Sequence, residues 1–271
     1  MGGMTLSVCI LDSRLTGDEL NAVQRFLIGI GEVSILTAKT TWELFRPPFE
    51  WNLLVEQLES GGVKSLSISV LTAVFTGMVM ASQFSIGLEP FGASIYTTTL
   101  VSEGIVRELG PVLTGLLVGG RVGAGFTAEL GSMAVTEQID AVRCLGADPV
   151  RKLVLPRVVA MVVALPLLTM LADIVGCLGG GLIAMIEVGV TLQFTLDQIL
   201  DTVGPADLLH GLFKSVFFGY FIAIIACWVG LRTRGGTVGV GRATTLTVVV
   251  TSVTILVSDF VLTRLFLALY G

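Results

Sequence analysis

Several ionisable side chains lie inside long apolar stretches of this 271-residue chain, and five of them are of particular interest. Arg107 and Glu108 share one stretch, and Asp173, Lys214 and Asp259 each lie in a later one. Charged residues within membrane-crossing segments are energetically costly and commonly mark substrate paths, proton relays or ion pairs between helices. These five residues are therefore the first candidates for function.

Arg107 and Glu108 are neighbours in sequence, so on a helix their side chains point about 100° apart. They cannot neutralise each other on one face, and we predict that at least one faces a cavity for a charged headgroup. Two interpretations stay open for Asp173, Lys214 and Asp259. They pair with each other and with backbone groups to fix helix register, or they carry ions.

The rest of the sequence gives no support for enzymatic chemistry. The only histidine, His210, excludes a multi-histidine metal site, and the four cysteines form no CxxC pair. Lys39, Lys64 and Lys214 precede Ser or Thr but lack the preceding glycine of a phosphate-binding loop. We expect no catalytic residue, metal or cofactor, and any ATPase must be a separate subunit. The net charge of −5 argues against nucleic-acid binding.

The elements that position these residues must be membrane helices. Hydrophobic residues make up 53% of the chain and charged residues only 14%, against about 25% in a typical soluble protein. The mean hydropathy is +0.89. We predict an all-α integral membrane protein, because a spanning helix needs about 20 apolar residues and five such stretches are present. The predicted spans are 65–88, 100–128, 153–186 (tilted, or broken at Pro166), 206–231 and 243–270.

An amphipathic helix is predicted over residues 20–46, ahead of the first span. Its apolar residues recur every three or four positions, as in helices that lie in the membrane interface. Pro47-Pro48 ends it. The alternative is a soluble helix packed on a partner, and residues 1–19 form a separate leader. The apolar positions are Leu20, Val23, Leu27 and Ile30, and aromatic anchors follow at Trp42, Phe45, Phe49 and Trp51.

The distribution of Lys and Arg predicts the orientation. Neither residue occurs over 65–106 or 158–213, which contain the loops after spans one and three. Positive residues gather instead in the loops after spans two and four, and such loops are typically cytoplasmic. The N-terminus is therefore predicted to be cytoplasmic and the C-terminus external. The marking residues are Arg143, Arg151, Lys152, Arg232, Arg234 and Arg242.

Small residues recur every four positions in spans two and three. Such faces let helix backbones approach closely. Two interpretations stay open: packing inside one bundle, or a dimer seam or substrate-lining face. The residues are Gly115, Gly119, Gly123, Thr127 and Gly131 in span two, and Gly176, Gly180 and Ala184 in span three.

A short helix is predicted between spans two and three, from Glu137 to Cys144. Thr136 has the side chain of an N-cap, and Gly146 would end the helix. Polar and apolar faces on so short a helix suit docking into a groove on a soluble partner, whereas a plain connector is the alternative. The polar residues are Glu137, Gln138, Asp140 and Arg143, beside Ile139, Val142 and Leu145.

Several sequence blocks resemble a known family. RELGPVLTGLLVGGRVGAGFTAELGSMAVTEQIDAV (107–142) is similar to the signature of the MlaE/YrbE permeases. These are the membrane subunits of bacterial ABC transporters that move phospholipids or other lipids with MCE-domain proteins. The resemblance continues in order through GADPVRKLVLPRVVA (146–160), LPLLTMLADIVGCLGG (165–180), Lys214-Ser215, GVGRATT (239–245) and DFVLT (259–263), and covers roughly residues 20–271.

The resemblance implies a permease domain over 20–271 that forms a homodimer in the bacterial inner membrane and contributes to outer-membrane lipid asymmetry. A cytoplasmic ATPase would dock on the short helix, and a periplasmic MCE protein would receive or supply phospholipid. Residues 1–19 resemble the end of a STAS-type domain, which some relatives carry, so a STAS-domain protein is a further partner. The implied coupling residues are Thr136, Glu137, Gln138, Ile139 and Asp140, with Arg143 beside them.

The resemblance also implies a lipid cavity between two permease copies. Its apolar residues would hold acyl chains, and Arg107 or Glu108 would lie near the headgroup. Two rival functions remain: a secondary transporter driven by ions through Asp173, Lys214 and Asp259, or a scaffold that transports nothing. The implied lipid-binding residues are Met80, Phe84, Gly87, Leu88, Phe91, Arg107, Glu108 and Leu109.

Overall fold

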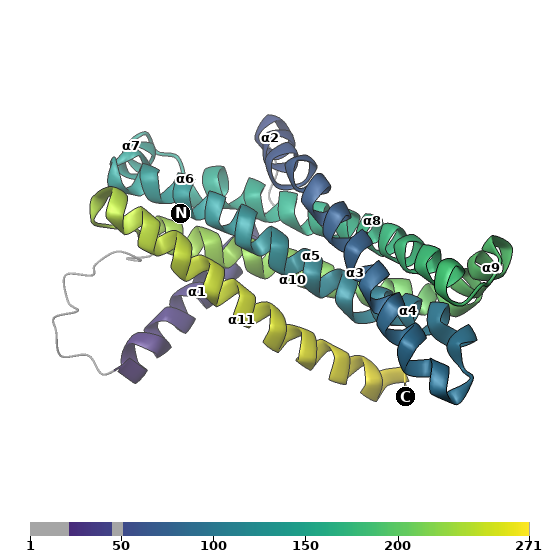
Figure 1. Cartoon of the computed structure of the whole chain (residues 1–271). Helices are drawn as coiled ribbons and strands as arrows, with labels where there is room; N and C mark the ends of the chain where they lie inside the picture. The colour runs from purple at the N-terminus through teal and green to yellow at the C-terminus, as the bar shows by residue number, and fades with distance from the viewer. Residues whose placement is uncertain (1–21, 45–50, 271) are drawn as a thin grey trace.

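A computed structural model describes residues 22–44 and 51–270, and every regular element in these ranges is a helix (Figure 1). The predicted leader, Phe45, Pro47-Pro48 and Phe49 lie outside the described residues. The helices are α1 (Ala22–Leu44), α2 (Trp51–Gly61), α3 (Leu66–Leu88), α4 (Thr97–Gly104), α5 (Gly110–Val118), α6 (Ala124–Val135), α7 (Gln138–Cys144), α8 (Leu155–Glu187), α9 (Leu192–Thr202), α10 (Pro205–Leu231) and α11 (Gly236–Tyr270).

Five helical stretches have the length and apolar composition of membrane spans, which confirms the predicted fold class. All five stretches are longer than predicted because helical residues continue beyond the predicted bounds, most of all where α2 precedes α3. They are Trp51–Phe91 (α2 and α3), Ser94–Val135 (α4, α5 and α6), Val150–Glu187 (α8), Pro205–Leu231 (α10) and Gly236–Ala268 (α11).

The second span is one path of three helices joined by wider π-helical turns at Ile105–Leu109 and Gly119–Gly123. In contrast, α8 runs without a break through Pro166. The missing N–H of a proline is tolerated in a membrane helix when neighbouring helices hold the chain in place. Leu165 and Leu168, on either side of the proline, are both buried in the core.

The core of the bundle lies where α10 packs against α8 and against α6. Its largest fully buried side chains include Phe126, Met161, Leu165, Phe218 and Ile222. The apolar residues on the outside of α3, α8 and α11 remain exposed, as expected for surfaces that meet lipid rather than water.

The small-residue face of span two packs inside the chain. A Cβ added at Gly115 would lie 3.3 Å from Phe218, and one at Gly131 would lie 3.1 Å from Thr233. The Thr127 hydroxyl is 2.8 Å from that of Thr247. Helices α10 and α11 therefore cover this face, which confirms the internal-packing interpretation for span two.

The small residues of α8 bring its backbone against α3. A Cβ added at Gly77 would lie 2.0 Å from the carbonyl oxygen of Gly176. One added at Gly180 would lie 2.7 Å from Val101 and 3.1 Å from the Gly77 carbonyl oxygen. Only glycine permits this crossing.

Helix α1 confirms the predicted N-terminal helix over its described part. Its polar side chains hold it to the rest of the protein: Glu32 pairs with Arg232, and Lys39 pairs with Asp148 at 2.7 Å. Thr41 adds a hydrogen bond of 3.0 Å with the Tyr220 hydroxyl. The exposed side chains are mainly apolar, namely Leu27, Ile28, Ile30, Ile35, Trp42 and Leu44.

The start of α7 differs from the prediction. Thr136 does not cap this helix, because its hydroxyl donates to the Ser132 carbonyl oxygen at 2.8 Å and so completes α6. Glu137 follows in the left-handed conformation, with φ of 60°, and α7 begins at Gln138. The predicted end is confirmed, since Gly146 has φ of 76° directly after the helix.

Candidate functional site

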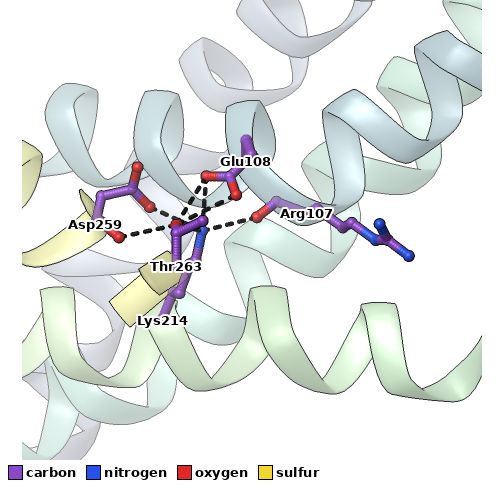
Figure 2. A network of polar contacts seen from close by, with 5 residues as sticks. All are labelled: Arg107, Glu108, Lys214, Asp259 and Thr263. Carbon is purple, nitrogen blue, oxygen red and sulfur yellow. Dashed lines mark hydrogen bonds and ion pairs between the residues drawn. The ribbon is translucent and has the colours of Figure 1, made fainter. Parts of the chain in front are cut away.

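A buried lysine joins three of the five spans. Lys214 of α10 places its Nζ 2.7 Å from Glu108 Oε2, 3.0 Å from Asp259 Oδ1 and 2.8 Å from Thr263 Oγ1 (Figure 2). It also donates to the backbone carbonyl oxygen of Arg107 at 3.0 Å. We call Lys214, Glu108, Asp259 and Thr263 the Lys214 cluster.

Each member of this cluster depends on local helical geometry. The π-helical turn at Ile105–Leu109 directs Glu108 and the Arg107 carbonyl toward α10. Asp259 and Thr263 are four residues apart on α11 and therefore share one face. The Lys214 side chain is only 2% exposed. A buried cation needs this ring of oxygen atoms, because an unpaired charge would be strongly unfavourable there.

The pairing interpretation of the intramembrane charges is correct for two of three residues. Lys214 and Asp259 form an ion pair, and Glu108 joins them from span two. Asp173 is not part of this cluster and lies buried elsewhere on α8.

The Arg107 side chain points away from the Lys214 cluster (Figure 2). Its guanidinium group forms an ion pair with Glu103 and contacts Asp207 Oδ1 at 2.7 Å. Arg107 remains 45% exposed despite both partners. It is therefore placed to contact a further anion, whereas Lys214 is not.

A cavity of about 430 Å³ lies between these two groups. Charged side chains form one part of its lining, and Phe266 and Leu267 form an apolar part. The His210 ring stacks on Phe266 with ring centroids 4.1 Å apart. Such a lining suits a ligand with a charged head and an apolar body. The lining residues are Glu103, Gly104, Arg107, Glu108, His210, Lys214, Thr263, Phe266 and Leu267; we call this the Arg107 cavity.

The other predicted lipid-binding residues lie away from this cavity. Met80 and Phe84 pack against an apolar cluster that contains Val101 and Ile105. Leu109 lines a second, smaller cavity. Gly87 and Phe91 are exposed at the end of the first span, and Leu88 beside them is partly exposed. The structure therefore brings together only Arg107 and Glu108 from the predicted set, and acyl-chain contacts by the remainder stay a prediction.

Sequence reasoning missed several cavity residues. Glu103 lies four residues before Arg107, a spacing that signals an ion pair on one helix face. Thr263 stands in the same relation to Asp259. Asp207 and His210 gave no comparable signal, because their proximity to Arg107 and Phe266 depends on how α10 packs.

The residues of α7 lie at the opposite end of span two from this cavity (Figure 1). Ile139 is buried and holds α7 against the bundle. Arg143 pairs with Asp140 at 2.8 Å. The remaining predicted coupling residues, Thr136, Glu137 and Gln138, are exposed together with Asp140 and Arg143. The exposed residues thus form a polar surface next to Leu145, which is 85% exposed.

Comparison with known proteins gives a consistent result. The family model described as Permease MlaE matches residues 54–265. A probable ABC transporter permease protein of Rickettsia conorii is 39% identical over 242 residues, which are 89% of this chain and 93% of the relative. A probable ABC transporter permease protein of Synechocystis is 41% identical over 78% of this chain and 80% of its own length.

A third relative carries a more specific name. The intermembrane phospholipid transport system permease protein MlaE of Haemophilus influenzae is 37% identical over 214 residues, which are 79% of this chain and 82% of that protein. The family match covers most of the chain, including all the residues of the Lys214 cluster and α7. The chain therefore belongs to the MlaE family of ABC transporter permeases.

Proposed function

We propose that this permease moves phospholipid between the inner membrane and a periplasmic MCE-domain protein, and that a separate cytoplasmic ATPase supplies the energy. One observation supports this most directly. Span two connects the Arg107 cavity near its start to α7 at its end, within one helical path from Ser94 to Val135. Movement of α7 by a partner would therefore reach the cavity through a single element.

The cavity suits a phospholipid headgroup on chemical grounds. The Arg107 guanidinium can donate two parallel hydrogen bonds to a phosphate group. Glu108 and Asp259 hold Lys214, so the proposed phosphate contact rests on Arg107. Phe266 and Leu267 offer apolar contact for the start of an acyl chain.

The polar surface of α7 would dock on the ATPase. The Lys and Arg residues around α7 support a cytoplasmic position for this end, which makes the proposed N-terminus cytoplasmic and the proposed C-terminus periplasmic. Helix α1, with its exposed apolar side chains, would lie in the inner-membrane interface. A second copy of the permease would complete the transport path, and a STAS-domain protein is a further proposed partner.

The test is lipid transfer by the reconstituted permease with its co-expressed ATPase and MCE protein. We expect transfer of fluorescent phospholipid from vesicles to the MCE protein to require ATP hydrolysis. Transfer that proceeds without ATP but needs an ion gradient would show a secondary transporter instead. The absence of transfer under both conditions, from an intact complex, would favour a scaffold.

The same preparation tests the headgroup site. Arg107→Ala should reduce the phospholipid that co-purifies with the complex by roughly tenfold, since a charge-assisted bidentate contact is worth about 1.5–3 kcal/mol. Arg234→Ala is the matched control, because Arg234 is exposed after α10, far from the cavity. Equal lipid content in both variants would remove Arg107 from the proposed site.

A further inference from the structure

A buried carboxyl group lies outside the proposed site. Asp173 is in the interior of α8 and only 4% exposed. Its Oδ1 has no hydrogen-bond partner among the described residues. A buried ionised carboxylate without a cation or hydrogen-bond donors costs several kcal/mol, so such groups are normally paired or neutral.

Gly110 supplies the space that Asp173 occupies. A Cβ added at Gly110 would lie 1.7 Å from Asp173 Oδ1 and 3.0 Å from the carbonyl oxygen of Ile105. The Asp173 carboxyl therefore packs directly against the Gly110 Cα, and the Ile105 carbonyl oxygen nearby already accepts the Gly110 N–H of the π-helical turn. A carboxyl group that is buried here without a cation or a donor to Oδ1 is stable as the neutral acid, because protonation removes its charge.

No described side chain supplies a balancing positive charge. Helix α3, which packs along α8, carries no charged residue over Leu66–Leu88. The charged residues of span two nearest to Gly110 in sequence are Glu103, Arg107 and Glu108, and all three are ion-paired elsewhere. Lys214 of α10 is held by the Lys214 cluster. On α8 itself, the nearest titratable group is the buried thiol of Cys177, one turn away.

A second cavity borders the same glycine. It measures about 20 Å³, which is enough for one water molecule, and both Gly110 and Ala172 line it. Ser69 and Thr114 contribute hydroxyl groups to this lining, and the Ser69 hydroxyl has no hydrogen-bond partner in the described part of the chain. Asp173 does not line this cavity itself, but its carboxyl contacts Gly110, which does, so the cavity holds space for water next to the carboxyl.

We propose that Asp173 is a proton-binding site that links the packing of α8 against span two to protonation. In the packed arrangement Asp173 is the neutral acid and lies against the backbone of Gly110. When α8 and span two separate, water enters beside Gly110, the O–H bond breaks and the proton passes to water. The carboxylate that remains is hydrated, so the open arrangement is favoured as the proton concentration falls.

Infrared spectroscopy of the purified full-length complex in lipid tests the protonation state directly. We expect a carbonyl band of a protonated carboxyl group at neutral pH that is absent from Asp173→Asn. Asp201→Asn is the matched control, because Asp201 is exposed on α9 and should leave the band unchanged. Labelling of aspartate carboxyl groups with ¹³C in the unmodified protein should shift the band, which gives the same answer without a variant.

Stability against pH gives a second readout. The folded protein holds a proton that the unfolded chain releases above about pH 4, so the melting temperature of the wild type should fall relative to Asp173→Asn as the pH rises from that value. Asn keeps the size of the side chain without titrating. Lack of the band, or an equal loss of stability with rising pH in Asp173→Asn, would overturn the proposal. Neither readout uses transport, so failure of the Asp173 proposal would leave the proposed function intact.

Discussion

At the scale of single residues, the two basic side chains of the site differ in what surrounds them. Lys214 is enclosed by oxygen atoms from two other spans, whereas Arg107 is nearly half exposed beside a cavity. We therefore propose that Lys214 mainly stabilises the packing of the three spans and that Arg107 contacts the ligand. The distinction depends on the burial of the two side chains and on their directions, and Figure 2 shows the directions.

Removal of the Lys214 charge should destabilise the fold. Lys214→Met leaves Glu108 and Asp259 close together without their cation, and loss of one partner from a buried ion pair costs about 3–5 kcal/mol. We expect the lower end of this range, because Glu108 is 41% exposed. Unfolding in mixed detergent and SDS would measure the free energy. Lys64→Met is the control, since Lys64 is 58% exposed and its Nζ lies as far as 3.9 Å from Glu59 Oε1. This substitution should change the free energy of unfolding by less than about 0.5 kcal/mol.

At the scale of elements, the crossing of α3 and α8 depends on glycine at the contact. In Gly77→Ala the new methyl group would meet a backbone oxygen that cannot move aside, so the helices must separate, at a cost of about 1–3 kcal/mol. Gly125→Ala is a suitable control because no atom lies within 4 Å of its added Cβ. It should be neutral or stabilise α6 by up to about 1 kcal/mol. Equal melting temperatures for the two variants would contradict the observed crossing.

The polar surface of α7 leads to a prediction about assembly. Glu137→Lys reverses the charge of an exposed residue. The left-handed backbone conformation at this position, with φ of 60°, is equally unfavourable for Glu and for Lys, so the substitution changes the charge without adding backbone strain. We expect membrane insertion to be unchanged and affinity for the ATPase to fall at least about tenfold, which corresponds to 1.4 kcal/mol. Co-purification of the ATPase measures this. Glu59→Lys, which reverses an exposed charge on α2, should assemble normally; normal assembly of both variants would argue against docking on α7.

The sequence predicted these elements better than it predicted their contacts. Span positions follow from long apolar stretches, so all five spans were found. The predicted start of α7 was wrong. A threonine hydroxyl can cap the helix that follows it or donate to a carbonyl oxygen of the helix that precedes it, and Thr136 does the latter. The Lys214–Glu108 pair joins residues 106 positions apart and requires the π-helical turn that rotates Glu108 toward α10. No local pattern in the sequence specifies that rotation.

At the scale of the whole molecule, the two candidate surfaces lie at opposite ends of the bundle (Figure 1). Helix α7 is at one end with the loops rich in Lys and Arg, and the Arg107 cavity lies toward the end where α11 terminates. A transporter that receives energy on one side of a membrane and releases lipid on the other needs this separation. The arrangement therefore predicts how the protein is oriented in the membrane. This prediction can be tested without a transport assay.

The native cysteines provide that test of orientation. Cys144 is exposed on α7, whereas Cys177 and Cys227 are buried within the bundle. In a Cys9→Ser background, a membrane-impermeant maleimide should label Cys144 in inverted inner-membrane vesicles and leave intact spheroplasts unlabelled. Cys144→Ser is the control that assigns the signal, and permeabilised spheroplasts should recover it. Labelling of Cys144 from the periplasmic side would reverse the orientation, place the Arg107 cavity toward the cytoplasm and exclude α7 as the docking site for a cytoplasmic ATPase.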